Sequence, residues 1–268
     1  FANHGHNVSI ASFAAPHGLI VESIDPRVKV VDLQSDFKVN DKVVQTLRCL
    51  LIDQKIDVVI NQWGLPFVPA KVLKKAIHAP YHTMSPLATK PKLKTIAIYH
   101  NDPESNARIK DVEIALEGCK NPLRRMVLNV KRWAFKQITA SSMRYVYAHS
   151  DQYQVLSPNY IKGFMDFTGL KHTDHLISLT NPVTIDSSDF SYSFDKKQKE
   201  VIYCGRVDYN QKRVYRLIDA WALIEKDFPE WKLTIVGDGV SRKDVDEQAS
   251  KLGLKNVQFE GFHQPLEY

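Results

Sequence analysis

The sequence predicts an α/β protein with two Rossmann-like domains, the second of them incomplete in this chain. Short apolar strands alternate with amphipathic helices, a pattern that indicates βαβ units and parallel sheets. A polar stretch rich in Ser and Asp, from Pro182 to Glu200, interrupts the alternation, which then starts again. We therefore expect an N-terminal domain over residues 1–182, a connection over 183–199 and the first part of a C-terminal domain over 200–268.

The individual elements can be placed by their apolar spacing. The opening residues FANHGHNV indicate the end of a helix that stops at Gly5. In the first domain we expect strands at 8–13, 28–33, 56–63, 94–101, 153–157 and 176–181, and helices at 39–55, 103–118 and 121–147. In the second domain we expect strands at 200–204, 232–237 and 256–261, and helices at 212–226 and 241–252.

Composition narrows the class of protein. The chain of 268 residues is 44% apolar and 25% charged, as ordinary globular proteins are. No apolar run approaches the roughly 20 residues that cross a bilayer. The three cysteines form no CxxC pair, which favours a reducing, cytoplasmic compartment over a disulfide framework or a zinc site. The missing initiator methionine and the abrupt last residues lead us to expect that both ends of a longer protein are absent.

The formal charge of +6 and the pI of about 9.0 suit nucleic acid, an anionic membrane or a phosphorylated substrate. The stretch CGRVDYNQKR places Gly205, Arg206 and Lys212 where a strand passes into a helix. Ligands of parallel α/β folds bind at such strand ends, and a helix N-terminus attracts anions. Arg206 and Lys212 would suit a diphosphate, although two solvated loop charges explain the stretch equally well.

Two further strand ends carry glycines. IVGDG, from Ile235 to Gly239, holds the first two glycines of GxGxxG, but residue 242 is Arg, so the dinucleotide fingerprint fails. Gly237 and Gly239 would still permit a ligand to approach the backbone closely. Gly261 and Phe262 end the third strand, where an aromatic ring could support a base.

The runs GRVDYNQKRVYRLIDAW, WKLTIVGDG and LGLKNVQFEGF, in this order and spacing, resemble the C-terminal domain of retaining glycosyltransferases of the GT-B fold, family four ("glycosyl transferases group 1"). NHGHNVSIAS, IDVVINQ, IAIYHNDPE, VLSPNYIKGF and LISLTNPV resemble the first domain more loosely. The resemblance implies a metal-independent glycosyltransferase that uses a UDP- or GDP-linked sugar as co-substrate and needs no cofactor. Its acceptor would be a cell-surface polysaccharide or a lipid-linked glycan.

The resemblance also implies roles for residues. Gly205, Arg206 and Lys212 would hold the donor diphosphate, and His100 would lie beside the sugar as a catalytic residue. The nucleoside would contact Gly237, Asp238, Gly239, Gly261 and Phe262. The family's N-terminal glycine-rich loop and its later pair of glutamates have no counterpart between Phe1 and Tyr268. We therefore expect this fragment to be inactive by itself.

The segment 120–144 holds seven Lys or Arg and no acid, in a helical pattern. Leu123, Met126, Val127, Val130, Trp133 and Ala134 share one side of that helix. Arg124, Arg125, Lys131, Arg132 and Lys136 share another, together with Leu128 and Phe135. A core helix with a solvated outer face is slightly favoured, and the alternative is contact of the basic residues with the inner face of the plasma membrane.

Other signals are given little weight. Asp244 and Asp246 form a DxD motif, but they fall in a helical pattern and read as a solvated surface. The pairs His172 and His175, and His78 and His82, lack a third ligand, so we expect no metal site. Two other functions remain as alternatives: a related GT-B sugar-nucleotide enzyme such as an epimerase, or a basic nucleic-acid-binding protein, which lacks any recognised motif.

Overall fold

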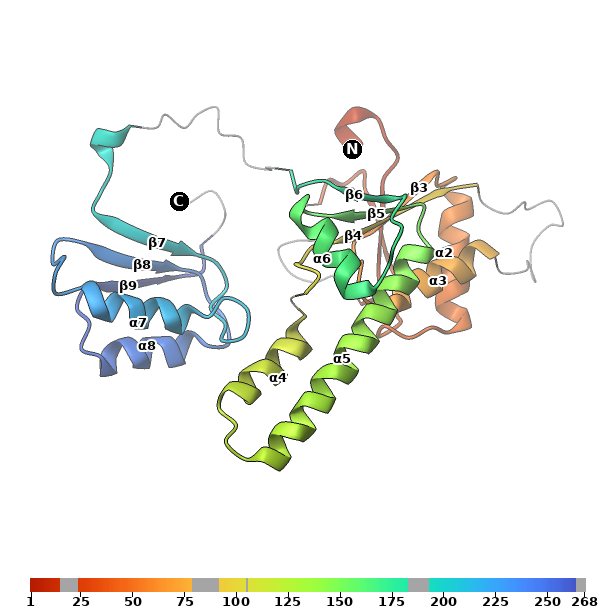
Figure 1. Cartoon of the computed structure of the whole chain (residues 1–268). Coiled ribbons are helices and arrows are strands. Elements are labelled where there is room, and N and C mark those ends of the chain that lie inside the picture. The colour runs from red at the N-terminus through yellow and green to blue at the C-terminus, as the bar shows by residue number, and fades with distance from the viewer. Residues whose placement is uncertain (15–23, 79–91, 105, 183–192, 264–268) are drawn as a thin grey trace. The chain divides into compact units, whose positions relative to one another are not determined.

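The computed structural model describes residues 1–14, 24–78, 92–104, 106–182 and 193–263 (Figure 1). The chain divides into two compact units, Phe1–Pro182 and Val183–Tyr268. Both units are α/β with parallel strands, which confirms the predicted fold class.

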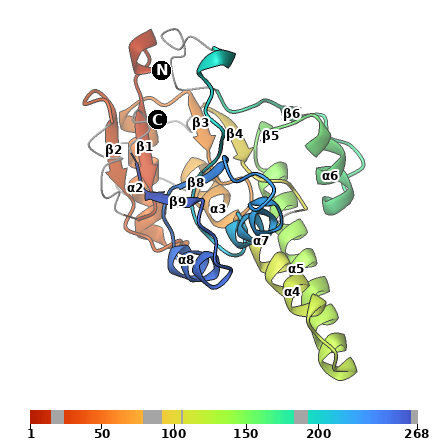
Figure 2. The same cartoon turned by 90° about the vertical axis from the view of Figure 1, so that its left-hand side faces the viewer.

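The first unit holds a four-stranded parallel sheet in the order β3-β4-β5-β6 and a parallel pair, β1-β2. Figure 2 shows this pair next to β3. The strands are β1 (Ser9–Ser12), β2 (Lys29–Asp32), β3 (Val58–Asn61), β4 (Lys94–Tyr99), β5 (Gln152–Val155) and β6 (Leu176–Ser178). The helices are the 3-10 turn η1 (Ala2–His4), then α2 (Asp41–Asp53), α3 (Phe67–His78), α4 (Ala107–Glu117), α5 (Pro122–Ala148) and α6 (Asn159–Thr168).

Two of these helices, α3 and α6, were not predicted. Pro69 lies in the first turn of α3, where a backbone N–H needs no partner inside the helix, so proline does not prevent this helix. In α6 the interior Gly163 weakens the helical pattern, and the helix ends at Gly169 in the left-handed region, with φ 72°. Pro69 and Gly163 therefore weakened the helical pattern of two segments that tertiary packing nevertheless holds as helices.

Two apolar clusters hold the first unit together. One joins α2 and α3 with Leu33, and the other joins β4, β5 and α6 with the second half of α5. From α5 the second cluster takes Met143, Val146 and Tyr147, all buried. The first half of α5 contains no buried residue, and α4 and α5 project from the unit as a hairpin (Figure 1). The favoured interpretation of segment 120–144 as a core helix is therefore wrong for its first half.

The second unit is a parallel sheet in the order β7-β8-β9, with α7 and α8 on the same face in Figure 1. Its elements are the 3-10 turn η2 (Phe194–Lys196), β7 (Glu200–Cys204), α7 (Val214–Ile224), β8 (Lys232–Val236), α8 (Arg242–Lys251) and β9 (Val257–Gly261). The core forms where Ile218 and Trp221 of α7 meet Leu233 and Ile235 of β8. This packing fixes the carboxyl ends of the three strands, from which the candidate site is built.

Candidate functional site

The loops that follow β7, β8 and β9 are joined by backbone hydrogen bonds. The Gly205 N–H donates to the carbonyl oxygen of Val236 (2.9 Å), and the Val207 N–H donates to that of Asp238 (2.9 Å). The Gly237 N–H donates to the carbonyl oxygen of Gly261 (2.6 Å). The structure thus brings together, at one edge of the sheet, the strand-end glycines that the sequence singled out.

The glycines of the β8 loop are required by the neighbouring loop. A Cβ on Gly237 would lie 2.0 Å from the carbonyl oxygen of Gly205, and a Cβ on Gly239 would lie 2.3 Å from that of Val207. Neither position can accept a side chain without moving the β7 loop. At Gly261, by contrast, an added Cβ meets no atom within 4 Å, although its φ of 77° still favours glycine.

Arg206 is held in place by two partners on its own turn. Its Nε donates to a carboxylate oxygen of Asp208 (2.9 Å), and its Nη2 donates to Oε1 of Gln211 (2.6 Å). The Arg206 side chain is nevertheless 60% exposed. Within the described residues its Nη1 donates to no side chain or backbone atom. Arg206 therefore presents an oriented guanidinium with donors left for a ligand.

Asp208 ties this turn together. One carboxylate oxygen accepts the Arg206 guanidinium, and the other accepts the backbone N–H groups of Gln211 (2.6 Å) and Lys212 (3.1 Å). Burial alone would raise the pKa of Asp208, but the N–H groups of Gln211 and Lys212 and the Arg206 guanidinium lower it below its usual range. The carboxylate is therefore ionised when the turn is formed.

Lys212 lies just before α7, which begins at Val214, two residues later than the spacing predicted. The Arg213 backbone turns into the left-handed region (φ 52°) and leads into the helix. Lys212 is exposed, and in the described part of the chain its ammonium contacts no other side chain. The backbone N–H of Lys212 and the Arg206 guanidinium share one carboxylate, so both cations belong to a single turn beside the start of α7.

Two predicted nucleoside contacts, Asp238 and Phe262, lie in the loops after β8 and β9. Asp238 accepts the N–H of Gly239 (2.7 Å) with its own carboxylate, which fixes the β8 loop. Phe262 follows β9 directly, and 68% of its surface is exposed, so its ring is free to meet a flat ligand. The assignment of the nucleoside to these residues stays a prediction.

In the first unit, His100 follows β4 and is exposed. Its Nε2 lies 2.7 Å from Oε1 of Gln62, which comes from the loop after β3. An amide oxygen only accepts, so Nε2 carries the hydrogen and Nδ1 is an acceptor whenever the ring is neutral. Gln62, which sequence reasoning missed, therefore sets the orientation and the tautomer of His100.

His100 and Gln62 lie in a cavity of about 960 Å³ at the carboxyl ends of β3 and β4. Its lining also includes Trp63, Gly64, Leu65, Pro66, Phe67, Val68, Lys71, Tyr99, Asn101, Asn106, Ala107, Arg108, Ile138, Thr139, Ser141, Ser142 and Tyr145. Burial, and secondarily the Asp102 carboxylate, raises the pKa of Tyr99 to about 12, so its hydroxyl keeps its proton. This lining is mainly aromatic and apolar, with Lys71 and Arg108 as its cations, an arrangement typical of ligand pockets.

The floor of this cavity is firmly fixed. The Gly64 N–H donates to the carbonyl oxygen of Ile98 (2.9 Å), and the Tyr153 hydroxyl donates to that of Gly64 (2.6 Å). Ser142 of α5 donates to the carbonyl oxygen of Leu65. A Cβ on Gly64 would lie 2.8 Å from Tyr99, so this loop sits directly on β4. Gln62 and Trp63 are therefore presented from a rigid support.

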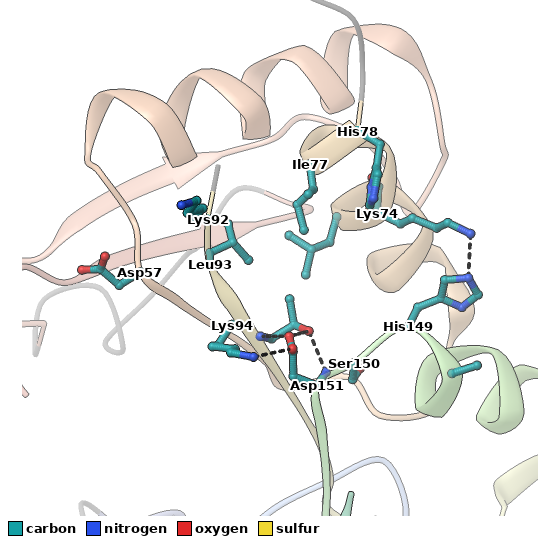
Figure 3. Close-up of a pocket in the computed structure, with 13 residues that line it drawn as sticks. Asp57, Lys74, Ile77, His78, Lys92, Leu93, Lys94, His149, Ser150 and Asp151 are labelled. Carbon is teal, nitrogen blue, oxygen red and sulfur yellow. Dashed lines mark hydrogen bonds and ion pairs between the residues drawn. The ribbon is translucent and has the colours of Figure 1, made fainter. Parts of the chain in front are cut away.

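A second cavity, of about 970 Å³, lies at the opposite, amino-terminal edge of the same sheet (Figure 3). There Asp151 accepts the backbone N–H and the hydroxyl of Thr95 (2.8 and 2.9 Å) and pairs with Lys94 (3.1 Å). Lys74 donates to Nε2 of His149 (2.7 Å). These polar groups satisfy one another and join the starts of β4 and β5, so we assign this edge a structural role.

The structure adds no support for a metal site at the DxD motif or at the histidine pairs of the sequence. Asp246 pairs with Arg242 on the surface of α8, and His175 stacks on Tyr147 with ring centres 3.9 Å apart. His78 contacts the carbonyl oxygen of Lys74, whereas His82 lies outside the described residues. Among the residues that the structure describes, no three His, Cys, Asp or Glu side chains are grouped as metal ligands. In the same part of the chain no helix is long and apolar enough to cross a bilayer.

The parallel α/β architecture of the chain is that of proteins with the GT-B fold. Residues 184–267 match the family model described as "Glycosyl transferases group 1". The architecture is shared by WaaG, "a glycosyltransferase involved in lipopolysaccharide biosynthesis" (TM-score 0.57, 16% identity, 98% of this chain and 64% of that one). It is also shared by the "lipopolysaccharide outer core galactosyltransferase WaaB" (TM-score 0.51, 18% identity, 89% and 54%). The second unit is therefore similar to the glycosyl transferases group 1 family, and the chain shares its fold with glycosyltransferases.

Sequence similarity to a curated relative is local. The "Amylovoran biosynthesis glycosyltransferase AmsD" of Erwinia amylovora is 39% identical over 66 residues, which make up 25% of this chain and 18% of AmsD. The chain therefore spans less than two thirds of the length of each of these relatives.

The contact between the β7 and β8 loops predicts a large effect of Gly237→Ala. The new Cβ would clash with the Gly205 carbonyl, and the φ of 130° is unfavourable for alanine. Urea unfolding should show a loss of roughly 2 to 4 kcal/mol. Gly253→Ala, at a positive φ of 69° in open space, is the matched control and should lose about 1 kcal/mol. Equal losses in the two variants would contradict the close packing of the loops.

The ionised Asp208 predicts a pH-dependent effect of Asp208→Asn. Because the folded state lowers the pKa, the carboxylate adds stability above its unfolded pKa, and this contribution disappears as pH falls through the folded pKa. At pH 7 the variant should lose roughly 1 to 3 kcal/mol of unfolding free energy. The difference from wild type should shrink below about pH 4. The exposed Asp227→Asn should show little change at either pH, and a difference that grows in acid would refute the argument.

Proposed function

We propose that the chain belongs to a retaining, metal-independent glycosyltransferase that moves a sugar from a UDP- or GDP-linked donor to a glycan or lipid-linked acceptor. The observation that carries this proposal is the turn in which Asp208 orients Arg206 beside Lys212 and the start of α7. This turn lies inside the segment that matches the glycosyl transferases group 1 family.

The donor diphosphate would bind at this turn. During transfer the bond from the anomeric carbon to the diphosphate breaks, and a bond to the acceptor oxygen forms. The electron pair of the broken bond and the proton of the acceptor hydroxyl leave with the nucleoside diphosphate. An oriented guanidinium, an ammonium and a helix N-terminus stabilise the charge that develops on the leaving group. Because these groups can supply the positive charge, we propose that no metal is required.

The acceptor and the transferred sugar would lie near His100. With Nε2–H committed to Gln62, Nδ1 can accept a hydrogen bond from a sugar hydroxyl. Retention depends mainly on how closely donor and acceptor are positioned, so a histidine fixed by its neighbour suits this role.

The biological setting is also a proposal. The names of AmsD and WaaG refer to amylovoran and lipopolysaccharide biosynthesis, and both are glycosyltransferases. By analogy we propose that this protein builds a cell-surface polysaccharide or glycolipid at the inner face of the plasma membrane. The exposed basic residues of α5, Arg124, Arg125, Lys131 and Lys136, would lie near the anionic lipid there, whereas Arg132 is half-buried on the side of the helix away from it.

Calorimetric titration with UDP, GDP and ADP tests the donor site. One nucleotide should bind selectively, and Arg206→Ala and Lys212→Ala should each weaken it about ten- to one hundredfold, since each removes a charged hydrogen-bond donor. Lys212→Ala is the cleaner variant, because the Lys212 ammonium makes no hydrogen bond or ion pair in the described residues. Addition of EDTA should leave the affinity unchanged.

Lys226→Ala is the matched control, since it removes an exposed cation beyond the far end of α7 and should leave nucleotide affinity unchanged. Equal binding by wild type, Arg206→Ala and Lys212→Ala would refute the assignment of the turn. Loss of binding in EDTA would refute metal independence.

A further inference from the structure

The first half of α5 exposes a continuous apolar stripe. Its members lie at helical spacing and are between 60% and 71% exposed: Leu123, Met126, Val127, Val130 and Trp133. Three half-buried residues of this part of the helix, Leu128, Arg132 and Phe135, fall on the opposite side, and the small Ala134 is half-buried between the exposed side chains of the stripe. That opposite side continues into the core through Thr139 and Met143. The stripe is therefore the face of α5 that the first unit leaves uncovered.

The stripe is bordered by positive charge. The hairpin over residues 107–148 carries nine Lys or Arg against three Asp or Glu, which equals the whole formal excess of the chain, +6. Arg124 and Lys131 lie beyond one border of the stripe and Lys136 lies beyond the other, with Arg125 farther round toward the half-buried side. An exposed apolar face between basic borders is the arrangement of a helix that lies in a membrane interface.

The same stripe runs into the cavity of His100. Ile138, which is 61% exposed, and then Ser141 and Tyr145 continue the helical spacing of the stripe and line the cavity wall. From Leu123 to Ile138 the helix rises about 22 Å. The basic hairpin, the apolar stripe and the cavity are thus successive parts of one surface of the first unit.

We propose that this surface receives a lipid-linked acceptor directly from an anionic bilayer. The stripe enters the boundary between headgroups and acyl chains, and the mouth of the cavity is thereby held at the lipid surface. The polar head of the acceptor then enters the cavity, where Trp63 and Phe67 offer apolar faces to sugar rings. Lys71 and Arg108 face a phosphate or other anionic group of that head. This inference rests on the proposed transferase function and names its acceptor class.

Two other occupants fit less well. A second copy of the chain would bring two hairpins of net charge +6 against each other, and like charges oppose such contact. Nucleic acid would match the charge but would leave the stripe of Leu, Met, Val and Trp without an apolar partner. An anionic bilayer satisfies both the charge and the apolar area.

Vesicle sedimentation tests the membrane contact. The chain should bind vesicles that contain phosphatidylglycerol and bind pure phosphatidylcholine vesicles far more weakly. Val130→Glu/Trp133→Glu should lower the partition coefficient more than about tenfold. Each of Arg124→Gln and Lys131→Gln should lower it about fivefold. Leu223→Glu, at an 81% exposed apolar position on α7, is the matched control and should bind as wild type does.

A second arm tests the cavity. Phosphatidylglycerol vesicles that also contain a few per cent of a polyprenyl phosphate should bind more tightly than vesicles of equal total charge without it. Trp63→Ala removes an exposed wall of the cavity away from the stripe, so it should abolish this gain and keep binding to the undoped vesicles. An equal gain in wild type and Trp63→Ala would overturn the acceptor assignment.

Equal vesicle binding by wild type and Val130→Glu/Trp133→Glu would overturn the membrane contact. Vesicle-free dimerisation that these substitutions abolish would assign the stripe to a second copy instead. Nucleotide titration of the same variants separates the two proposals, because the second unit is unchanged in them. Selective nucleotide binding without vesicle binding would refute this inference alone, whereas vesicle binding without nucleotide binding would refute the donor assignment alone.

Discussion

The carboxylate of Asp208 is the group on which the candidate donor site depends. It is largely buried in the turn after β7, where an ionised group is stable only if hydrogen bonds surround it. The bonds come from the Arg206 guanidinium and from the backbone of Gln211 and Lys212. Satisfying this one buried charge therefore shapes the turn, orients one cation and sets where the chain enters α7. The candidate site for an anion is thus organised around an anion of the protein itself.

The packing of the strand-end loops gives this turn a rigid base. Gly237 and Gly239 let the β8 loop lie against the β7 loop, and backbone hydrogen bonds then join both to the end of β9. A preorganised site loses little entropy when a ligand binds, which is why glycines that contact only protein still serve binding. The loop after β3 is fixed in a similar way, because Gly64 packs directly against β4 and the same loop places Gln62 next to His100.

The periodicity of apolar residues predicted most of the strands and helices, but it did not predict which contacts hold the loops in place. The bounds of β7, residues 200–204, were predicted as observed, because apolar strands between charged ends leave little choice. The glycines of IVGDG were predicted to let a ligand approach the backbone. In the structure the backbone of the β7 loop lies against Gly237 and Gly239 instead. The sequence alone cannot distinguish a glycine that contacts a ligand from one that contacts another loop. The role of Asp208 could have been predicted, because Asp side chains commonly accept hydrogen bonds from backbone N–H groups of the turn that follows them. Gln62 could not, because its partner His100 is 38 residues away.

In the segment 120–144 the sequence pattern predicts a helix but does not show which face of that helix is buried. Its period predicts a helix, and α5 confirms that helix, but the pattern contains two faces with apolar residues. The face with more of them looked like the core side. The structure buries the other face instead, because α5 continues into the core through Thr139, Met143 and Val146, and helix geometry carries that side back to Phe135 and Leu128. The richer apolar face is therefore left exposed in the described residues, and the basic side chains beside it are the reason why we propose an anionic bilayer as its partner.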